Sequence, residues 1–168
     1  MIYRYNRALD HTLLTKYYIL TQGNDEKMTS LHLACKLGSL DLVKFIIEQS
    51  TELHILEYAI DAEDHLGLTP IYHLCQRGFL KKAKKGEVQK EHEDRKHMIE
   101  LLIQGNAEWC FVCKEIGYTP LHWLAYWNDF ASINHLLKVV DKQTDDKSKI
   151  LRLMFMSKKG LTPIDIAG

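Results

Sequence analysis

Few features of the composition direct this chain toward nucleic acid, a membrane or the cell exterior. Its 168 residues include 22 basic and 22 acidic side chains, so the formal net charge is zero, and the chain as a whole has no electrostatic attraction to nucleic acid or to an anionic membrane. It has no run of about eighteen apolar residues, and its first residues lack the charge, apolar core and cleavage site of a signal peptide. These absences predict a soluble protein that is intracellular and, we expect, cytoplasmic.

Cysteine and proline are both scarce. The four cysteines do not indicate a disulfide framework. Two of them, Cys35 and Cys75, take the same small apolar position in two similar segments, and we expect both to be buried as free thiols. The three prolines, Pro70, Pro120 and Pro163, each follow a threonine. This shared setting leads to the main feature of the sequence.

A short phrase recurs four times along the chain. Its copies are MTSLHLACKLG from Met28, LTPIYHLCQRG from Leu68, YTPLHWLAYWN from Tyr118 and LTPIDIAG from Leu161. The threonine in each copy can cap a helix, and a proline after it suits the first helical turn, where no N–H donor is needed. An internal repeat of this kind indicates a stack of similar units.

Each of the first three copies predicts a pair of helices. A residue that accepts the left-handed conformation follows each threonine after nine positions, and this conformation ends many helices. These residues are Gly38, Gly78 and Asn128. Segments with helical apolar spacing then follow at residues 41–48, 97–104 and 131–138. Each unit is therefore predicted to be a short helix, a turn and a second helix.

The units resemble ankyrin repeats, whose signature is Thr-Pro-Leu-His-x-Ala followed by a glycine and a second apolar helix. The resemblance extends from about Asn24 to the C-terminus, with Ser30 in place of one proline and Tyr72 and Asp165 in place of the histidine. It implies an all-α ankyrin-repeat solenoid of stacked helix-turn-helix units with long loops between them.

The domain boundaries follow from this resemblance. Residues 1–27 are predicted to contain a degenerate capping helix, and residues 28–168 the repeat domain, with units that start near residues 28, 68, 118 and 161. The apolar stripe of the capping helix is predicted to consist of Leu9, Leu13, Tyr17 and Leu20. The last unit is incomplete, which favours a longer protein; the alternative is that its helix docks weakly on its neighbour.

The units are longer than the simplest ankyrin repeat, so extra residues must lie in the connections. The segment 79–96 is a charged insertion, in which the first half is predicted to be a mobile loop and residues 87–96 to extend the second helix into solvent. Its lysines, Lys81, Lys82, Lys84 and Lys85, are balanced by nearby acidic residues, so we expect a solvated segment rather than a phosphate site. The connection 141–156 is predicted to form a short helix packed on the stack.

The resemblance implies that partners bind the concave face, which is formed by exposed residues of the first helices and by the loop tips. The corresponding positions are Leu33, Lys36 and Leu37 in the first unit, His73, Gln76 and Arg77 in the second, and Trp123, Tyr126 and Trp127 in the third. The three aromatic residues share one helical face, and Trp and Tyr dominate interface hot spots. We therefore predict that they anchor a partner protein; the alternative is that they pack beneath one of the protein's own loops.

No catalytic site is indicated, because no serine or cysteine nucleophile has a base at a suitable spacing. His32 and His122 match the family histidine, and the resemblance implies a structural role for them. Cys110 and Cys113 form a C-x-x-C pair, but the second pair of ligands that marks a zinc site in sequence is absent. We expect the segment around them to pack one loop against its neighbour, with a metal or redox role as an alternative.

The predicted function is a protein-protein interaction module or adaptor with no catalysis, cofactor, nucleic acid or membrane insertion. Its alternative is an architectural segment of a larger multidomain protein, for example the intracellular ankyrin portion of a channel or effector.

Overall fold

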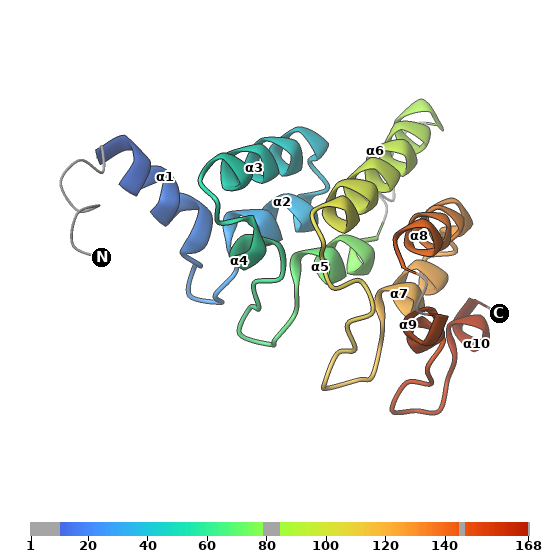
Figure 1. Cartoon of the computed structure of the whole chain (residues 1–168). Helices are drawn as coiled ribbons and strands as arrows, with labels where there is room; N and C mark the ends of the chain where they lie inside the picture. Colours follow the sequence, from blue (N-terminus) through green and yellow to red (C-terminus); the bar gives the residue numbers. More distant parts are fainter. Residues whose placement is uncertain (1–10, 79–84, 145–146, 168) are drawn as a thin grey trace.

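The computed structural model describes residues 11–78, 85–144 and 147–167 of the chain. This part of the chain consists of helices and connecting loops without a strand, which confirms the all-α class. The helices follow one another across the molecule from α1 to α10 (Figure 1). They are α1 (His11–Thr21), α2 (Ser30–Leu37), α3 (Leu40–Glu52), α4 (Leu56–Ile60), α5 (Pro70–Gln76), α6 (Lys85–Gln104), α7 (Pro120–Tyr126), α8 (Phe130–Gln143), α9 (Lys147–Leu153) and α10 (Pro163–Ala167).

The short first helices begin where the repeated phrase predicts them. Thr29, Thr69 and Thr119 occupy N-cap positions in extended backbone directly before α2, α5 and α7. The next helix of this series, α10, begins at Pro163. The prolines at these starts lose no hydrogen bond, because the first N–H groups of a helix have no acceptor within it. Local sequence thus determines where each unit begins.

The signature histidines join neighbouring units. The backbone N–H of Thr29 donates to His32 Nδ1 over 3.1 Å, and His32 Nε2 lies 3.0 Å from the carbonyl oxygen of Leu68 in the next unit. A carbonyl only accepts, so Nε2 carries the hydrogen and the imidazole is neutral. His122 makes the same two kinds of contact, to its own N-cap and to the following unit, at 3.0 and 3.2 Å. This geometry agrees with the structural role that the resemblance implies.

These buried histidines predict acid sensitivity. Burial lowers the pKa of His32 and of His122 below the usual value of 6.5, although the carbonyl contact opposes the shift. Below pH 6.5 the unfolded chain therefore binds protons that the folded chain does not, so this stability is complete above 6.5 and is lost as the pH falls toward the lowered pKa. We expect the urea midpoint to fall when the pH is reduced from about 7.5 to about 5.5.

The exposed histidine His54 provides the control for this experiment. It lies at a positive φ of 55°, so His54→Asn keeps a residue that tolerates this conformation. The variant should show the same pH dependence as the unaltered chain. A midpoint that does not change with pH would contradict neutral, buried histidines.

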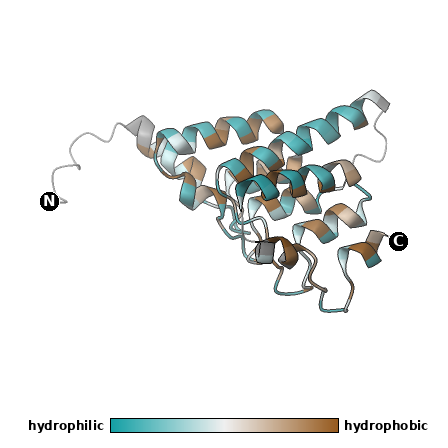
Figure 2. Cartoon of the chain, turned by 45° about the vertical axis from the view of Figure 1, so that its right-hand side comes forward, coloured by the Kyte–Doolittle hydropathy of each residue, from teal (hydrophilic) through white to brown (hydrophobic). Residues whose placement is uncertain are grey.

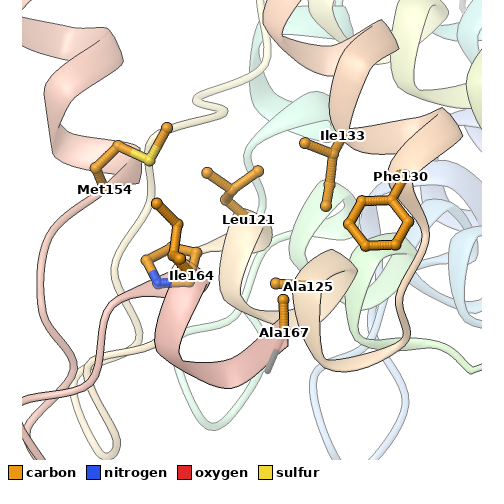
Figure 3. Close-up of a pocket in the computed structure, with 8 residues that line it drawn as sticks. Leu121, Ala125, Phe130, Ile133, Met154, Ile164 and Ala167 are labelled. Carbon is orange, nitrogen blue, oxygen red and sulfur yellow. The ribbon is translucent and has the colours of Figure 1, made fainter.

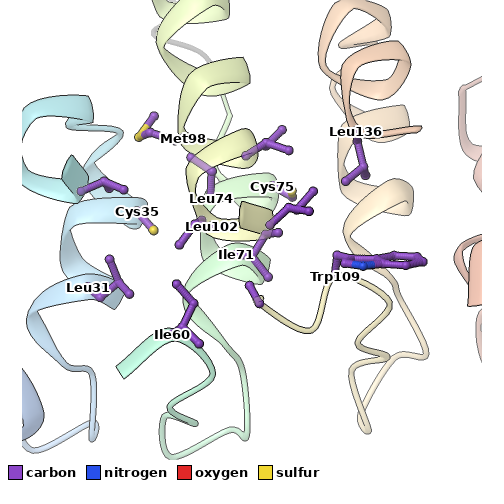
Figure 4. Close-up of a cluster of buried hydrophobic side chains, with 14 of the residues drawn as sticks. Leu31, Cys35, Ile60, Ile71, Leu74, Cys75, Met98, Leu102, Trp109 and Leu136 are labelled. Atoms are coloured by element: carbon purple, nitrogen blue, oxygen red, sulfur yellow. The ribbon is translucent and has the colours of Figure 1, made fainter. Parts of the chain in front are cut away.

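The longer second helices α3, α6 and α8 lie in one row, and the first helices lie in a second row beside them (Figure 1). Figure 2 shows hydrophilic and apolar stretches on the same helices, as expected for helices with one buried side. The core continues from unit to unit, with Leu31, Leu74, Leu102 and Leu136 fully or almost fully buried (Figure 4). Each such leucine stabilises the fold by about 1.5–3 kcal/mol relative to an exposed one. In the described part of the chain, no helix combines the length and apolar character needed to cross a membrane.

Helix α6 corrects the prediction for the charged insertion. Residues 87–96 extend the second helix as predicted, but its last turn is not solvated, because Arg95 is fully buried. The Nη1 atom of Arg95 lies 3.1 Å from Asp129 Oδ2, and its Nη2 donates to the carbonyl oxygen of Arg77 over 2.8 Å. His92 Nδ1 lies 3.0 Å from the other carboxylate oxygen of Asp129. Since a buried charge needs partners of this kind, the insertion fastens the second unit to the third.

Several predictions fall outside the described residues. They include most of the loop expected in the first half of the insertion, the lysines Lys81, Lys82 and Lys84, and the side chain of Lys85. Leu9 and the side chain of Leu13 are outside as well.

Short helices complete the stack. At the N-terminal end, α1 packs against α2 and α4, and Leu20 is buried there as predicted. Tyr17 is 45% exposed, so its place in the buried stripe was wrongly predicted; the neighbours of α1 cover only a narrow side of it. The connection 141–156 contains α9, which packs on the stack through the buried Leu153, as predicted. The separation of residues 1–27 as a capping segment stays a prediction.

Candidate protein-binding surface

Equivalent side chains of the first helices lie side by side, because α2 packs against α5 and α5 against α7. We call the side chains at the fourth, seventh and eighth positions after each N-cap threonine the concave row. In the first unit these positions are exposed: Leu33 is 39% and Leu37 66% exposed, and Lys36 lies between them. Two leucines with this exposure form an apolar start to the row.

His73 does not belong to the exposed part of the row, which corrects the prediction. Only 6% of it is exposed, and its Nε2 lies 2.8 Å from Asp64 Oδ2. The other oxygen of Asp64 accepts the backbone N–H groups of Leu66 and Leu68. Burial raises the pKa of Asp64, but these hydrogen bonds outweigh it and leave the pKa below its usual value. The His73 side chain therefore holds the loop before its own helix.

Sequence analysis missed this loop support, although a signal for it is present. Asn24 Oδ1 accepts two backbone N–H groups in the preceding loop, and Ser157 Oγ accepts one in the last loop. Each is a short polar residue four or five positions before the N-cap threonine, as Asp64 is. Asn, Asp and Ser commonly close turns in this way, so the pattern could have been read from the sequence.

Arg77 and Gln76 are half-buried because the neighbouring units cover part of them. The guanidinium of Arg77 lies over Gly38, where an added Cβ would be 2.6 Å from its Cζ, and it pairs with Glu91 of α6. The backbone carbonyl oxygen of Gln76 accepts the Trp127 indole N–H over 3.0 Å. Both residues thus connect units and show only part of their surface on the concave row.

The ring of Trp127 lies over Gly78, and this contact corrects the expected role of that glycine. Gly38 and Asn128 adopt the predicted left-handed backbone, with φ of 71° and 52°, but Gly78 does not. Helix α5 ends instead at Arg77, in extended backbone. A Cβ on Gly78 would be 2.7 Å from Trp127 Cη2. Gly78 is needed for the space it leaves, not for its backbone freedom.

This contact predicts the effect of Gly78→Ala. The added methyl group must displace the Trp127 ring and its hydrogen bond to Gln76, so we expect a loss of stability of about 1–3 kcal/mol. Chemical denaturation monitored by tryptophan fluorescence measures this loss. Gly86→Ala is the matched control, because a Cβ there would meet nothing within 4 Å. Equal stability of the two variants would show that Trp127 is not held against Gly78.

Trp123 and Tyr126 complete the aromatic part of the row. Trp123 is half-buried, with its ring centroid 6.5 Å from that of Tyr72 and 5.2 Å from that of Tyr118. Tyr126 is 54% exposed, and its ring centroid lies 5.9 Å from that of Trp123 and 4.9 Å from that of Trp127, edge to face in both cases. The tryptophans therefore pack the third unit on the second, and Tyr126 is the aromatic side chain that remains well exposed.

The C-x-x-C pair lies inside the loop between the second and third units. Cys110 and Cys113 are both buried, as is Trp109, and Phe111 packs against the small cluster around Tyr72. The predicted packing of this loop is confirmed. Among the described residues, no three side chains gather in a way that would hold a metal ion.

The other two cysteines are buried free thiols, as predicted. Burial raises the pKa of Cys35, and it raises the pKa of Cys75 to about 12. A thiol with a raised pKa is a poor nucleophile, since the thiolate is the reactive form. Both side chains act as small apolar core residues.

The comparison with known families agrees with this geometry. The model of the ankyrin repeat family matches residues 26–61, which contain α2, α3 and α4. The chain is an ankyrin-repeat protein, and its fold is an ankyrin-repeat solenoid. No curated protein matches it. Ankyrin repeats are in general protein-interaction modules and typically non-catalytic.

Proposed function

We propose that this protein binds a partner protein through the concave row and acts as a cytoplasmic adaptor without catalysis. The observation that supports this proposal best is the setting of Tyr126. Its ring is more than half exposed, yet its neighbours Trp123 and Trp127 hold it in place from two sides. An aromatic side chain fixed in this way loses little conformational entropy when a partner covers it.

The rest of the row supports the same surface. The exposed Leu33 and Leu37 offer apolar area at the other end, and Lys36 and Arg77 bring positive charge between the two ends. A central aromatic anchor with apolar and charged neighbours is the usual composition of an interface hot spot. We therefore expect a partner segment that places apolar side chains on Tyr126 and Leu37 and an acidic group near Lys36.

The role of each row residue in binding stays part of this proposal. Trp123, Trp127, Gln76 and His73 support the surface from below, whereas Tyr126, Leu37, Lys36 and Arg77 would contact the partner.

Affinity capture followed by mass spectrometry tests the proposal, with the partner's affinity then measured for purified variants. Tyr126→Ala should weaken binding by about 30-fold or more, as expected for a hot-spot tyrosine that contributes at least 2 kcal/mol. Tyr58→Ala is the matched control, since Tyr58 is 70% exposed on α4 and outside the row. A partner that binds both variants equally well would exclude the concave row as its binding site.

A further inference from the structure

An apolar groove opens at the C-terminal end of the stack (Figure 3). Its volume is about 220 Å³, and its walls come from α7, α8 and α10. The residues that matter here are Leu121 and Ala125 of α7, Phe130 and Ile133 of α8, and Ile164 of α10. Every side chain that lines the groove is apolar. Phe130 is 60% and Ile164 76% exposed, so a large apolar area faces solvent here.

The first unit has the same residues in the same places, but they are covered. Counted from the N-cap threonine, Leu121 corresponds to Leu31 and Ile133 to Val43. Both residues of the first unit are fully buried, whereas Ile133 is only half-buried. The two surfaces therefore have matching apolar character and differ in what lies over them.

Helix α6 makes the difference. It packs against α3 and α5, and its residues Met98, Ile99 and Leu102 are buried in the core that includes Leu31 and Val43. At the end of the stack α8 takes the place of α3, and α10 takes the place of α5. In the described part of the chain no helix lies over α8 and α10 as α6 lies over α3 and α5.

We propose that this groove is a second binding site, which accepts one amphipathic α-helix from a partner protein. The repeat itself specifies the chemistry of that helix. Like α6, it should carry apolar residues in pairs one turn apart, as Met98 and Ile99 precede Leu102 and Ile103. Its other side should be polar, because it would face solvent as the outer side of α6 does. Helices of this kind bind apolar grooves by these anchor residues.

A second copy of this chain is a poorer occupant. Helix α1 has three adjacent exposed residues with large side chains, Tyr17, Tyr18 and Ile19. Two of them carry hydroxyl groups, which need hydrogen-bond partners when they are buried. A groove with only apolar walls offers none, so burial of these tyrosines there would cost free energy.

The test uses the full chain and a fluorescein-labelled peptide with the sequence of residues 85–104, which is α6 itself. Fluorescence anisotropy should show saturable binding to the unaltered protein. A control peptide with Ile99→Asp and Leu102→Asp should not bind, because it keeps the charged face and loses the apolar one. Failure of the first peptide to bind, or equal binding of both, would overturn the proposal.

Protein variants then locate the site. Phe130→Asp and Ile164→Asp should each weaken peptide binding by about tenfold or more. Phe130 is the first residue of α8, where a carboxylate is favourable, so the fold should persist. Phe45→Asp on α3 is the matched control, because Phe45 is 56% exposed and lies outside the groove. Equal affinities of all three variants would overturn the proposal.

Sedimentation of the protein alone distinguishes the other occupant. A monomer at the concentrations used for the titration is the expected result. A dimer that Phe130→Asp dissociates would assign the groove to a second copy and overturn the proposed helix of a partner protein. The concave-row variant Tyr126→Ala should bind the peptide normally, so failure here is distinguishable from failure of the proposed function.

Discussion

Replacement of Asp129 with alanine is expected to lower the free energy of unfolding by about 3–5 kcal/mol. The Asp129 carboxylate is fully buried and lies within 3.1 Å of Arg95 Nη1, His92 Nδ1 and the backbone N–H of Ser132. Without it, the buried guanidinium of Arg95 loses its anionic partner, and α8 loses its N-cap. Equilibrium denaturation with urea, followed by circular dichroism, measures the change.

Two further variants separate the causes. Asp129→Asn keeps a good N-cap residue and removes the charge, so its loss should be smaller than that of the alanine variant. Asp141→Ala removes an exposed carboxylate from the same helix and should change stability by less than about 0.5 kcal/mol. If Asp129→Ala were as mild as Asp141→Ala, the buried ion pair would not be holding the two units together.

Replacement of Leu102 with alanine is expected to destabilise the fold by about 2–5 kcal/mol. Leu102 is fully buried on α6, the helix that packs against both α3 and α8 (Figure 4). The close packing around it leaves a cavity that its neighbours cannot fill, so the variant loses contacts as well as buried area.

The matched control for this variant is Leu42→Ala, in which the leucine is 46% exposed on α3. It should cost less than about 1 kcal/mol, since little buried area is lost. Similar losses for both leucines would mean that α6 is not clamped between its neighbours.

The parts of the fold that the sequence predicts correctly depend on local chemistry. Thr29, Thr69 and Thr119 begin helices because a threonine in extended backbone is suited to the N-cap, whatever the rest of the chain does. The apolar spacing of α3, α6 and α8 likewise appears within a few turns. Such features can be read from a window of ten or fifteen residues, as about three to four helical turns hold.

The incorrect predictions concern contacts between distant residues. Helix propensity identified residues 87–96 as helical, but could not show that Arg95 meets Asp129, 34 positions away. His73 was expected on the surface because its helix position is exposed in the first unit, yet Asp64 draws it into the loop. Exposure of a polar side chain depends on a partner that the periodicity does not reveal.

The candidate binding surface was predicted in position but not in detail. Three aromatic residues on one face of a helix do not indicate which of them is covered. The answer depends on Tyr72 and Gly78 in the preceding unit, against which Trp123 and Trp127 pack. Tyr126 has no such neighbour in that unit among the described ring contacts and stays exposed.

The contacts of Arg77 with Gly38 and of Trp127 with Gly78 limit how such a protein can evolve or be engineered. In each pair the second unit supplies the bulk and the first supplies the empty space. A unit transplanted from elsewhere would fit after Gly78 only if its side chain could occupy that space, and a larger residue at position 78 would require a smaller one at position 127. Substitutions at these two positions, 49 residues apart in the chain, should therefore be inherited together, and the order of the units cannot be shuffled freely.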